Sequence, residues 1–248
     1  MTEWSWNKEK EGETVSIEEN IRLVREKIRA AAESVGRSEA DIRLLGASKM
    51  NDADACREAI RAGIDALGEN RVQEMCEKWE KNAYAGAPLH FIGHLQRNKV
   101  RQVVGKVDLI ESVGSLPLLA EIGKEAEKQN LVQDVLLEVN LGREEAKSGF
   151  FEEDLARAVE AALACPSVRL CGLMTVPPVA AEGESSLPYF EKLHGLYLDI
   201  SRSVCHNNFV YLSMGMSGDY EDAIRAGATV VRVGRAIFGQ RVYPAQNG

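Results

Sequence analysis

The sequence predicts an α/β protein, a single (β/α)8 barrel (TIM barrel) with one extra helix before the first strand. Short runs rich in apolar and β-branched residues alternate with stretches of helical spacing, as in βα units around a parallel sheet. Eight such units can be counted, and a chain of 248 residues has the size that one barrel of this kind uses. The main alternative is a doubly wound open sheet.

The extra helix has a clear start and end. Ser16, followed three residues later by Glu19, forms a capping box, and apolar residues then recur at helical spacing as far as Gly36. We therefore expect residues 1–15 to be a flexible N-terminal segment and residues 16–244 to form one barrel domain.

The predicted strands follow the alternation of apolar runs and lie near residues 42–48, 66–68, 89–93, 109–113, 135–140, 170–175, 210–214 and 230–234. Helical segments are expected between them, near residues 52–62, 71–83, 98–104, 116–129, 152–164, 189–203 and 221–226. Residues 59–63 and 223–227 both read AIRAG, each at the end of a predicted helix. Glycine suits the left-handed position that ends a helix.

Composition excludes several classes of protein. A net charge of -8 and an isoelectric point near 5.2 disfavour nucleic-acid binding, which needs a concentrated basic surface. No apolar run approaches the roughly 18 residues of a membrane span, and no signal peptide is evident. The 5 cysteines are widely spaced without a C-x-x-C motif, so reduced thiols are expected. We expect a cytoplasmic monomer that binds neither nucleic acid nor membrane.

Lys49 is the most informative polar residue. Barrel proteins place their ligand-binding groups at the C-terminal ends of the strands, and Lys49 directly follows the apolar run 42–48. Partial desolvation lowers the pKa of a lysine and leaves a neutral amine that can attack an aldehyde to form a Schiff base. The alternative is a surface lysine at the start of a helix.

The segment after the last predicted strand favours an anion site. Gly234 would let backbone N–H groups approach a ligand closely, and barrels often bind phosphate after strands seven and eight. Ser213 and Ser217, near the preceding strand end, could donate hydroxyl protons to the same anion. The segment lacks the Lys-Ser or Lys-Thr of a nucleotide P-loop.

His90 and His94 are four residues apart, but they flank a predicted strand instead of sharing a helix face. Opposite ends of a strand do not ligate one ion, so we expect no metal site here.

Several motifs in order resemble the pyridoxal phosphate homeostasis protein family, whose barrel is related to the N-terminal domain of alanine racemase. They are GASK at 46–49, GENRVQE at 68–74, HFIGHLQ at 90–96, GLM at 172–174, LSMGMS at 212–217 and VRVGRAIFG at 231–239. The resemblance runs from about residue 17 to 243. It departs from the family at Met50 and Asn51, where a threonine-containing turn is more usual, and at Gly114, where aspartate is common.

The resemblance implies pyridoxal 5′-phosphate (PLP) as cofactor, held as an internal aldimine on Lys49 with Asn70 and Met174 beside it. It implies phosphate contacts from Ser213, Ser217, Gly234 and Arg235. By the same resemblance, Arg232 faces the pyridine nitrogen of the cofactor. No catalytic residue is assigned.

The resemblance also implies a binding protein in intracellular PLP homeostasis instead of an efficient enzyme. PLP stabilises carbanions mainly when its ring nitrogen is protonated, and an arginine opposite that nitrogen leaves it unprotonated. Only ten residues follow Phe238, so we expect no second domain that supplies another base. PLP-dependent apoenzymes are candidate recipients of the cofactor.

Two other functions stay open at this point. One is an amino-acid racemase or lyase that uses the same lysine and cofactor. The other is a phosphosugar-type barrel enzyme whose Lys49 attacks a ketose.

Overall fold

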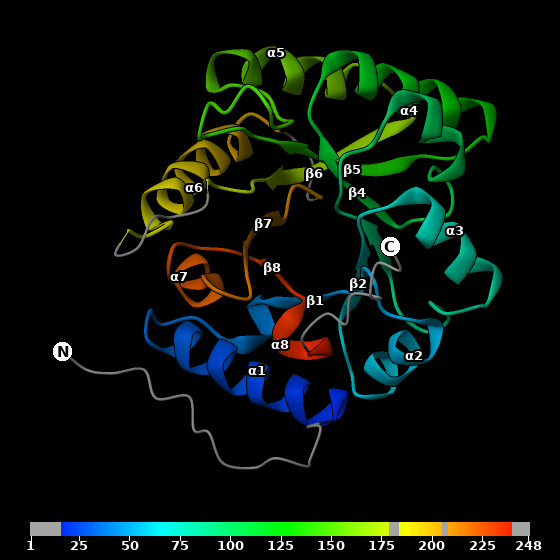
Figure 1. Cartoon of the computed structure of the whole chain (residues 1–248). Helices are drawn as coiled ribbons and strands as arrows, with labels where there is room; N and C mark the ends of the chain where they lie inside the picture. Colours follow the sequence, from blue (N-terminus) through cyan, green and yellow to red (C-terminus); the bar gives the residue numbers. More distant parts are fainter. Residues whose placement is uncertain (1–15, 179–183, 205–207, 240–248) are drawn as a thin grey trace, which may run out of the picture.

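The computed structural model describes residues 16–178, 184–204 and 208–239, and in it eight parallel strands close into a barrel in chain order (Figure 1). Strand β8 pairs with β1, which confirms the predicted barrel and excludes the open sheet. The expectation of a flexible segment at 1–15 lies outside the described residues. So do the last residues of the predicted domain, 240–244.

Each strand overlaps its predicted run. The bounds are β1 Arg43–Ala47, β2 Ala66–Glu69, β3 Leu89–Phe91, β4 Leu109–Val113, β5 Gln133–Glu138, β6 Val168–Met174, β7 Tyr211–Met216 and β8 Val230–Val233. The register shifts locally between β4 and β5, between β5 and β6, and between β7 and β8.

The helices surround the barrel. They are α1 Ile17–Glu33, α2 Ala53–Arg61, α3 Val72–Glu80, α4 Leu116–Lys128, α5 Glu152–Leu163, α6 Leu187–Ser201, α7 Tyr220–Arg225 and α8 Arg235–Phe238, with 3-10 helices η1 Glu39–Asp41 and η2 Arg97–Gln102. The helical segment predicted near 98–104 is the 3-10 helix η2. Val100 and Val103, both buried, are spaced by three residues, which suits the period of a 3-10 helix. The short helix α8 was not predicted.

Helix α1 begins at the predicted cap. The Ser16 hydroxyl accepts a hydrogen bond from the Glu19 backbone N–H at 3.2 Å, while the Glu19 carboxylate pairs with Arg22. The amide of Asn20 donates to the carbonyl oxygen of Ile237 at 2.9 Å, so α1 is tied to α8 just beyond the last strand. The extra helix therefore supports the segment that follows β8.

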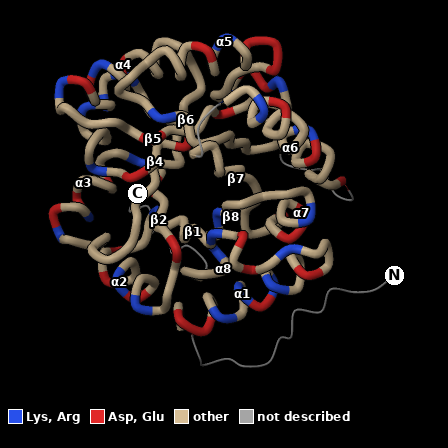
Figure 2. Tube along the Cα trace, turned by 180° about the vertical axis from the view of Figure 1, so that it is seen from behind, with Lys and Arg blue, Asp and Glu red and all other residues tan. Residues whose placement is uncertain are grey.

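The outer surface mixes both signs of charge. Figure 2 shows lysine and arginine interspersed with aspartate and glutamate over the outer helices. Within the described residues, no helix is long and apolar enough to cross a membrane.

Side chains on the barrel wall divide between two environments, since successive residues of a strand point to opposite faces. Those that point outward join the large core under the helices. Those that point inward form two small interior clusters, one of Leu45, Ala66 and Val230 and one of Leu109, Leu136, Cys171 and Met174. Buried polar residues share the interior with these clusters, since Arg232 is in register with Leu45 and His90 with Leu109.

We predict that Gly172→Ala destabilises the barrel by about 3 kcal/mol or more. Gly172 in β6 has a φ of +152°, and a Cβ there would overlap the carbonyl oxygen of Tyr211 in β7. Gly195 in α6 has open space around it, so Gly195→Ala should raise stability by up to about 1 kcal/mol. Urea titration of both variants measures the difference, and equal stability would contradict the close pairing of β6 with β7.

Candidate functional site

Lys49 and Asn70 follow adjacent strands at the same level of the barrel. The β1–β2 register pairs Ala47 with Gly68, so Lys49 and Asn70, each two residues further on, are level with one another. Leu45 points into the interior, and Lys49 lies four residues later in the turn beyond the end of β1. The role of Lys49 as a ligand-binding residue stays a prediction.

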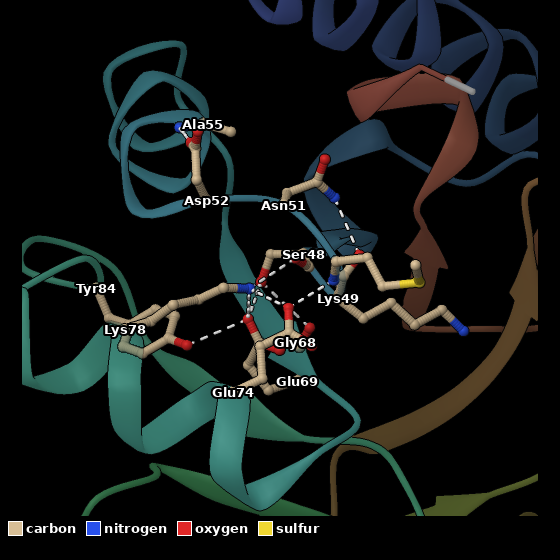
Figure 3. Close-up of polar contacts among 11 residues, drawn as sticks. Ser48, Lys49, Asn51, Asp52, Ala55, Gly68, Glu69, Glu74, Lys78 and Tyr84 are labelled. Carbon is tan, nitrogen blue, oxygen red and sulfur yellow. Dashed lines mark hydrogen bonds and ion pairs between the residues drawn. The ribbon is translucent and has the colours of Figure 1, made fainter. Parts of the chain in front are cut away.

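A short turn carries Lys49 from β1 to α2. Ser48 is fully buried, Lys49 is half-buried, and Met50 has a left-handed φ of 63°. Helix α2 then starts at Asp52, whose carboxylate accepts from the Ala55 backbone N–H at 2.9 Å. In Figure 3 the Lys49 side chain extends away from the charged groups that lie behind this turn.

A buried chain of polar groups crosses the barrel interior from β8 to β3. The Arg232 guanidinium donates to the Ser213 hydroxyl at 2.6 Å and to the Thr175 carbonyl oxygen at 2.8 Å. The Ser213 hydroxyl donates to one oxygen of Glu111 at 2.6 Å, and the other oxygen lies 2.7 Å from Nδ1 of His90. Arg232 is only 4 % exposed. Its cation is therefore held in one orientation inside the barrel.

The charges along this chain balance one another. Burial lowers the pKa of Arg232, and the nearby Glu111 opposes that change. Burial alone would raise the pKa of Glu111, but the hydrogen bond and charge of His90, the charge of Arg232 and the hydroxyl of Ser213 outweigh it and leave the pKa below its usual value. Glu111 is therefore the internal counter-ion of Arg232.

The two predicted phosphate serines lie in different surroundings. Ser213 is fully buried, and its hydroxyl proton is already donated to Glu111. Ser217 is partly exposed, and its oxygen accepts the Gly234 backbone N–H at 3.2 Å. Ser217 and Gly234 are thus brought together as predicted, whereas Ser213 is placed to orient Arg232.

Gly234 and Arg235 form the turn from β8 into α8. Gly234 has an ordinary φ of -110°, and a Cβ there would meet the Ala47 carbonyl oxygen at 3.4 Å, a normal contact distance. Backbone conformation therefore does not require glycine at this position. The Arg235 side chain is exposed, and its backbone lies in the first turn of α8.

Asn70 and Met174 complete the set of predicted residues. The side-chain oxygen of Asn70 is buried without a hydrogen-bond partner. Met174 is buried in the interior cluster and is in register with Ser213 on one side and Glu138 on the other. Asn70 therefore offers an unused acceptor, and Met174 offers an apolar wall.

Glu138 is an ionisable residue that the sequence analysis missed. It lies at the end of β5, and one of its carboxylate oxygens is buried without a hydrogen-bond partner. Burial raises its pKa to about 7, although the charge of Arg232 acts in the opposite direction. Glu138 can therefore gain or lose a proton near neutral pH.

Strand periodicity in the sequence could have identified two buried carboxylates that the sequence analysis did not name. Glu111 and Glu138 each come two residues after an inward leucine, Leu109 and Leu136, so strand periodicity predicts that both point inward. Lys78 in α3, also buried, had no such signal. Its spacing of four from Glu74 is typical of an exposed helix pair.

Two surface hollows of about 660 and 340 Å³ lie away from these residues. The larger is lined by residues around the start of β1, including Arg25, Arg43 and Asp65, and the smaller by residues around the starts of β3 and β4, including Trp79 and Lys106. Neither contains a predicted site residue. We place the candidate site by the strand ends and the chemistry of their side chains.

We predict that Glu138→Gln stabilises the protein at pH 8 by on the order of 2 to 3 kcal/mol. The folded-state pKa of about 7 exceeds the ordinary value of 4.5, so between these values the folded protein binds a proton that the unfolded chain releases. Stability therefore falls as pH rises through this window. The glutamine variant should lose this slope and match the parent near pH 4.5.

The control for this measurement is Glu127→Gln, which changes an exposed carboxylate on α4. Thermal or urea unfolding from pH 4.5 to 8.5 compares the curves. A parent curve without a decline from pH 5 to 8, or an unchanged slope in Glu138→Gln, would contradict the buried state of Glu138.

Comparison with known proteins places this geometry in a family. Residues 14–242 match the family model described as alanine racemase, N-terminal domain. The pyridoxal phosphate homeostasis protein of Aquifex aeolicus is 45 % identical over 225 residues, which are 91 % of this chain and 98 % of that protein. The Pseudomonas aeruginosa protein of the same name is 39 % identical over 230 residues, 93 % and 98 % of the two chains.

Solved structures agree with the sequence relatives. PipY of Synechococcus elongatus with PLP bound has a TM-score of 0.78 and 29 % identity, and the match covers 90 % of this chain and 100 % of that one. Alanine racemase of Clostridium difficile, with a TM-score of 0.63 and 20 % identity over 92 % of this chain and 58 % of that one, shares the fold. The chain belongs to the pyridoxal phosphate homeostasis protein family, within the larger group of barrels related to the N-terminal domain of alanine racemase.

Proposed function

We propose that this protein binds PLP reversibly through Lys49 and serves in cofactor homeostasis. The observation that carries the proposal is the pairing of β1 with β8, which brings the Lys49 turn beside the strand of the buried Arg232 and the Ser217–Gly234 contact. When bound, PLP supplies an aldehyde that condenses with an amine, with loss of water, to give a Schiff base. Lys49 is the amine in this proposal.

The residues of the mouth fit such a ligand. The buried oxygens of Asn70 and Glu138 have no hydrogen-bond partner within the protein, so polar groups of a ligand can contact these side chains without breaking an existing bond. Met174 and the neighbouring interior cluster offer an apolar surface for a flat ring. The proposed contacts thus combine one covalent bond with polar and apolar contacts.

The phosphate is proposed to lie where β7 and β8 end. The Ser217 hydroxyl and the backbone N–H groups of Gly234 and Arg235 are the proposed donors. An anion there would take over the bond that Ser217 now makes with Gly234. Ser213 is proposed to act through Arg232 and not on the phosphate, since its proton is bound by Glu111.

Storage is favoured over catalysis by the fixed cation. Arg232 is proposed to face the ring nitrogen, and its contacts to Ser213 and Thr175 leave it little freedom to move away. A guanidinium stays charged and cannot accept a proton, so it disfavours protonation of that nitrogen. The ring is then a poor electron sink, and the bound cofactor is released unchanged. Apoenzymes that need PLP are the proposed recipients, and a cytoplasmic location and a monomeric state remain predictions.

The alternative, a racemase or lyase, has one observation in its favour. Glu138 has a pKa of about 7 near the mouth, which suits general acid–base chemistry. Mixing the PLP-loaded protein with L-alanine or L-serine and assaying for the D-enantiomer or keto acid separates the two functions. Turnover that Glu138→Gln abolishes would replace the storage proposal.

We predict that the PLP-loaded protein is yellow and that borohydride reduction fixes the cofactor on Lys49. Lys49→Ala should lose the adduct completely, because Lys78, the buried lysine of the described residues, lies beside the same turn but is engaged by two carboxylates. Lys106→Ala, at the opposite end of the barrel, is the control and should retain it. Peptide mass spectrometry locates the adduct, and finding it mainly on another lysine would exclude the proposed binding mode.

We predict that PLP binds at least tenfold more tightly than pyridoxal, because charge-assisted hydrogen bonds to the phosphate are each worth about 1.5 to 3 kcal/mol. Ser217→Ala should reduce this preference about tenfold. Ser213→Ala should weaken both ligands equally, since it disturbs Arg232 instead of the phosphate. Titration of both ligands into each variant gives the ratios. A loss of preference in Ser213→Ala alone would reverse the assignment of the two serines.

A further inference from the structure

A buried charged cluster lies behind the turn that carries Lys49, between the barrel wall and α3. We define it as Glu69, Glu74 and Lys78. The Lys78 ammonium lies 2.7 Å from Oε1 of Glu69 and 2.7 Å from Oε1 of Glu74 (Figure 3). Two hydroxyl groups, of Ser48 at 2.6 Å and Tyr84 at 3.1 Å, also donate to the Glu69 oxygen.

The cluster holds both peptide groups that flank Lys49. Lys78 donates to the carbonyl oxygen of Ser48 at 2.8 Å, and Ser48 precedes Lys49 in the chain. Glu74 accepts from the backbone N–H of Met50, which follows Lys49. Because Lys78 and Glu74 are also paired with each other, the two flanking bonds form one clamp around Lys49.

The clamp holds a turn that has its own backbone closure. The Asn51 backbone N–H donates to the Ser48 carbonyl oxygen at 3.1 Å, and Met50, the third residue of this turn, has a left-handed φ of 63°. The bond from the Met50 N–H to Glu74 and the bond from Lys78 to the Ser48 carbonyl oxygen tie this closed turn to α3. Met50 is itself exposed, so packing of its side chain does not account for its backbone conformation.

Stability alone is a poor reason for this cluster. Lys78 is 5 % exposed and Glu69 is fully buried, and removing such charges from water costs about as much as their attraction returns. Apolar residues of similar size would serve a barrel wall equally well. Apolar residues, however, could not bind the carbonyl oxygen of Ser48 and the N–H group of Met50 on the two sides of Lys49.

The cluster also separates the chemistry of the two lysines. Burial alone would lower the pKa of Lys78, but the charge of Glu69 and the hydrogen bonds to Glu69 and Glu74 outweigh it, so the pKa is raised. Lys78 therefore stays an ammonium with no lone pair for an aldehyde. In Figure 3 the Lys78 ammonium reaches the turn from the side of α3, whereas the Lys49 side chain extends away from the turn on the other side.

We propose that Glu69, Glu74 and Lys78 are positioning residues that fix the Ser48–Met50 turn and so aim the Lys49 amine into the barrel mouth. The inference rests on the proposed function of Lys49 as the amine that binds PLP. The cluster acts from outside the barrel wall and does not touch the cofactor.

The test uses Glu74, because Lys78→Met would leave the buried Glu69 and the partly buried Glu74 without their cationic partner and so destabilise the protein strongly. Glu74→Ala removes the acceptor of the Met50 N–H, while Glu74→Gln keeps an oxygen there. Glu77→Ala removes an exposed carboxylate from the same helix and is the matched control. Thermal unfolding first establishes that each variant is folded.

Two measurements then report on the clamp. Amide hydrogen exchange of the cofactor-free protein should speed up at Met50 by at least tenfold in Glu74→Ala, with β2 and α3 unchanged. The second-order rate constant for adduct formation at Lys49, with PLP and with pyridoxal, should fall about tenfold for both ligands. Glu74→Gln should restore both values towards those of the parent, and Glu77→Ala should match the parent.

The outcomes separate this inference from the proposed function. If the parent protein forms no adduct at Lys49, both the proposed function and the positioning role are wrong. If it forms the adduct and Glu74→Ala does so equally fast, the positioning role is wrong and Lys49 remains the PLP-binding amine. A slower rate confined to PLP, with pyridoxal unaffected, would point to the phosphate site and would also overturn the clamp.

Discussion

The site depends on closure of the barrel by its first and last strands. Strands β1 and β8 pair in parallel from Arg43 with Val230 to Gly46 with Val233. This pairing brings the Lys49 turn beside the turn after β8, although they lie near opposite ends of the sequence. Because a shift of one residue would turn every inward side chain outward, the same register decides that Arg232 points into the interior.

The barrel wall separates two buried polar systems. Inside it, Arg232, Ser213, Glu111 and His90 form one continuous chain. Outside it, Glu69, Glu74 and Lys78 form a compact cluster against α3. Lys49 lies on the turn between them. Buried polar groups that are satisfied by many partners are rigid, so each system keeps its own side chains in a constant geometry.

The two systems differ in the charge that they offer a ligand. The interior chain presents a guanidinium whose counter-ion, Glu111, lies on the far side of Ser213. In the outer cluster, the charged groups bind the backbone of the turn and form ion pairs with each other. In the proposed mode of binding, a flat anionic ligand at the mouth would meet the fixed cation of Arg232 and several neutral donors.

The sequence by itself determined the architecture and pointed to the end of the barrel where the candidate site lies. These features follow from local patterns: alternating apolar runs, helix caps such as Ser16, and a lysine directly after an apolar strand. Local patterns of this kind can be recognised without knowing the tertiary structure, because natural sequences agree with their fold at the local level. The strand ends already pointed to Lys49, Asn70 and Arg232. A resemblance in several motifs then supplied the expected ligand.

Only the tertiary structure decided which partner each polar group meets. The bond between Ser213 and Glu111 joins residues 102 positions apart, and it places Ser213, which also accepts from Arg232, between two buried charged groups. Lys78 looks like one half of an exposed helix pair until β2 and the Lys49 turn are packed against it. The burial that raises the pKa of Glu138 likewise comes from several strands at once. Side-chain partners across a closed barrel depend on the shape of the whole chain, and no short stretch of sequence contains that information.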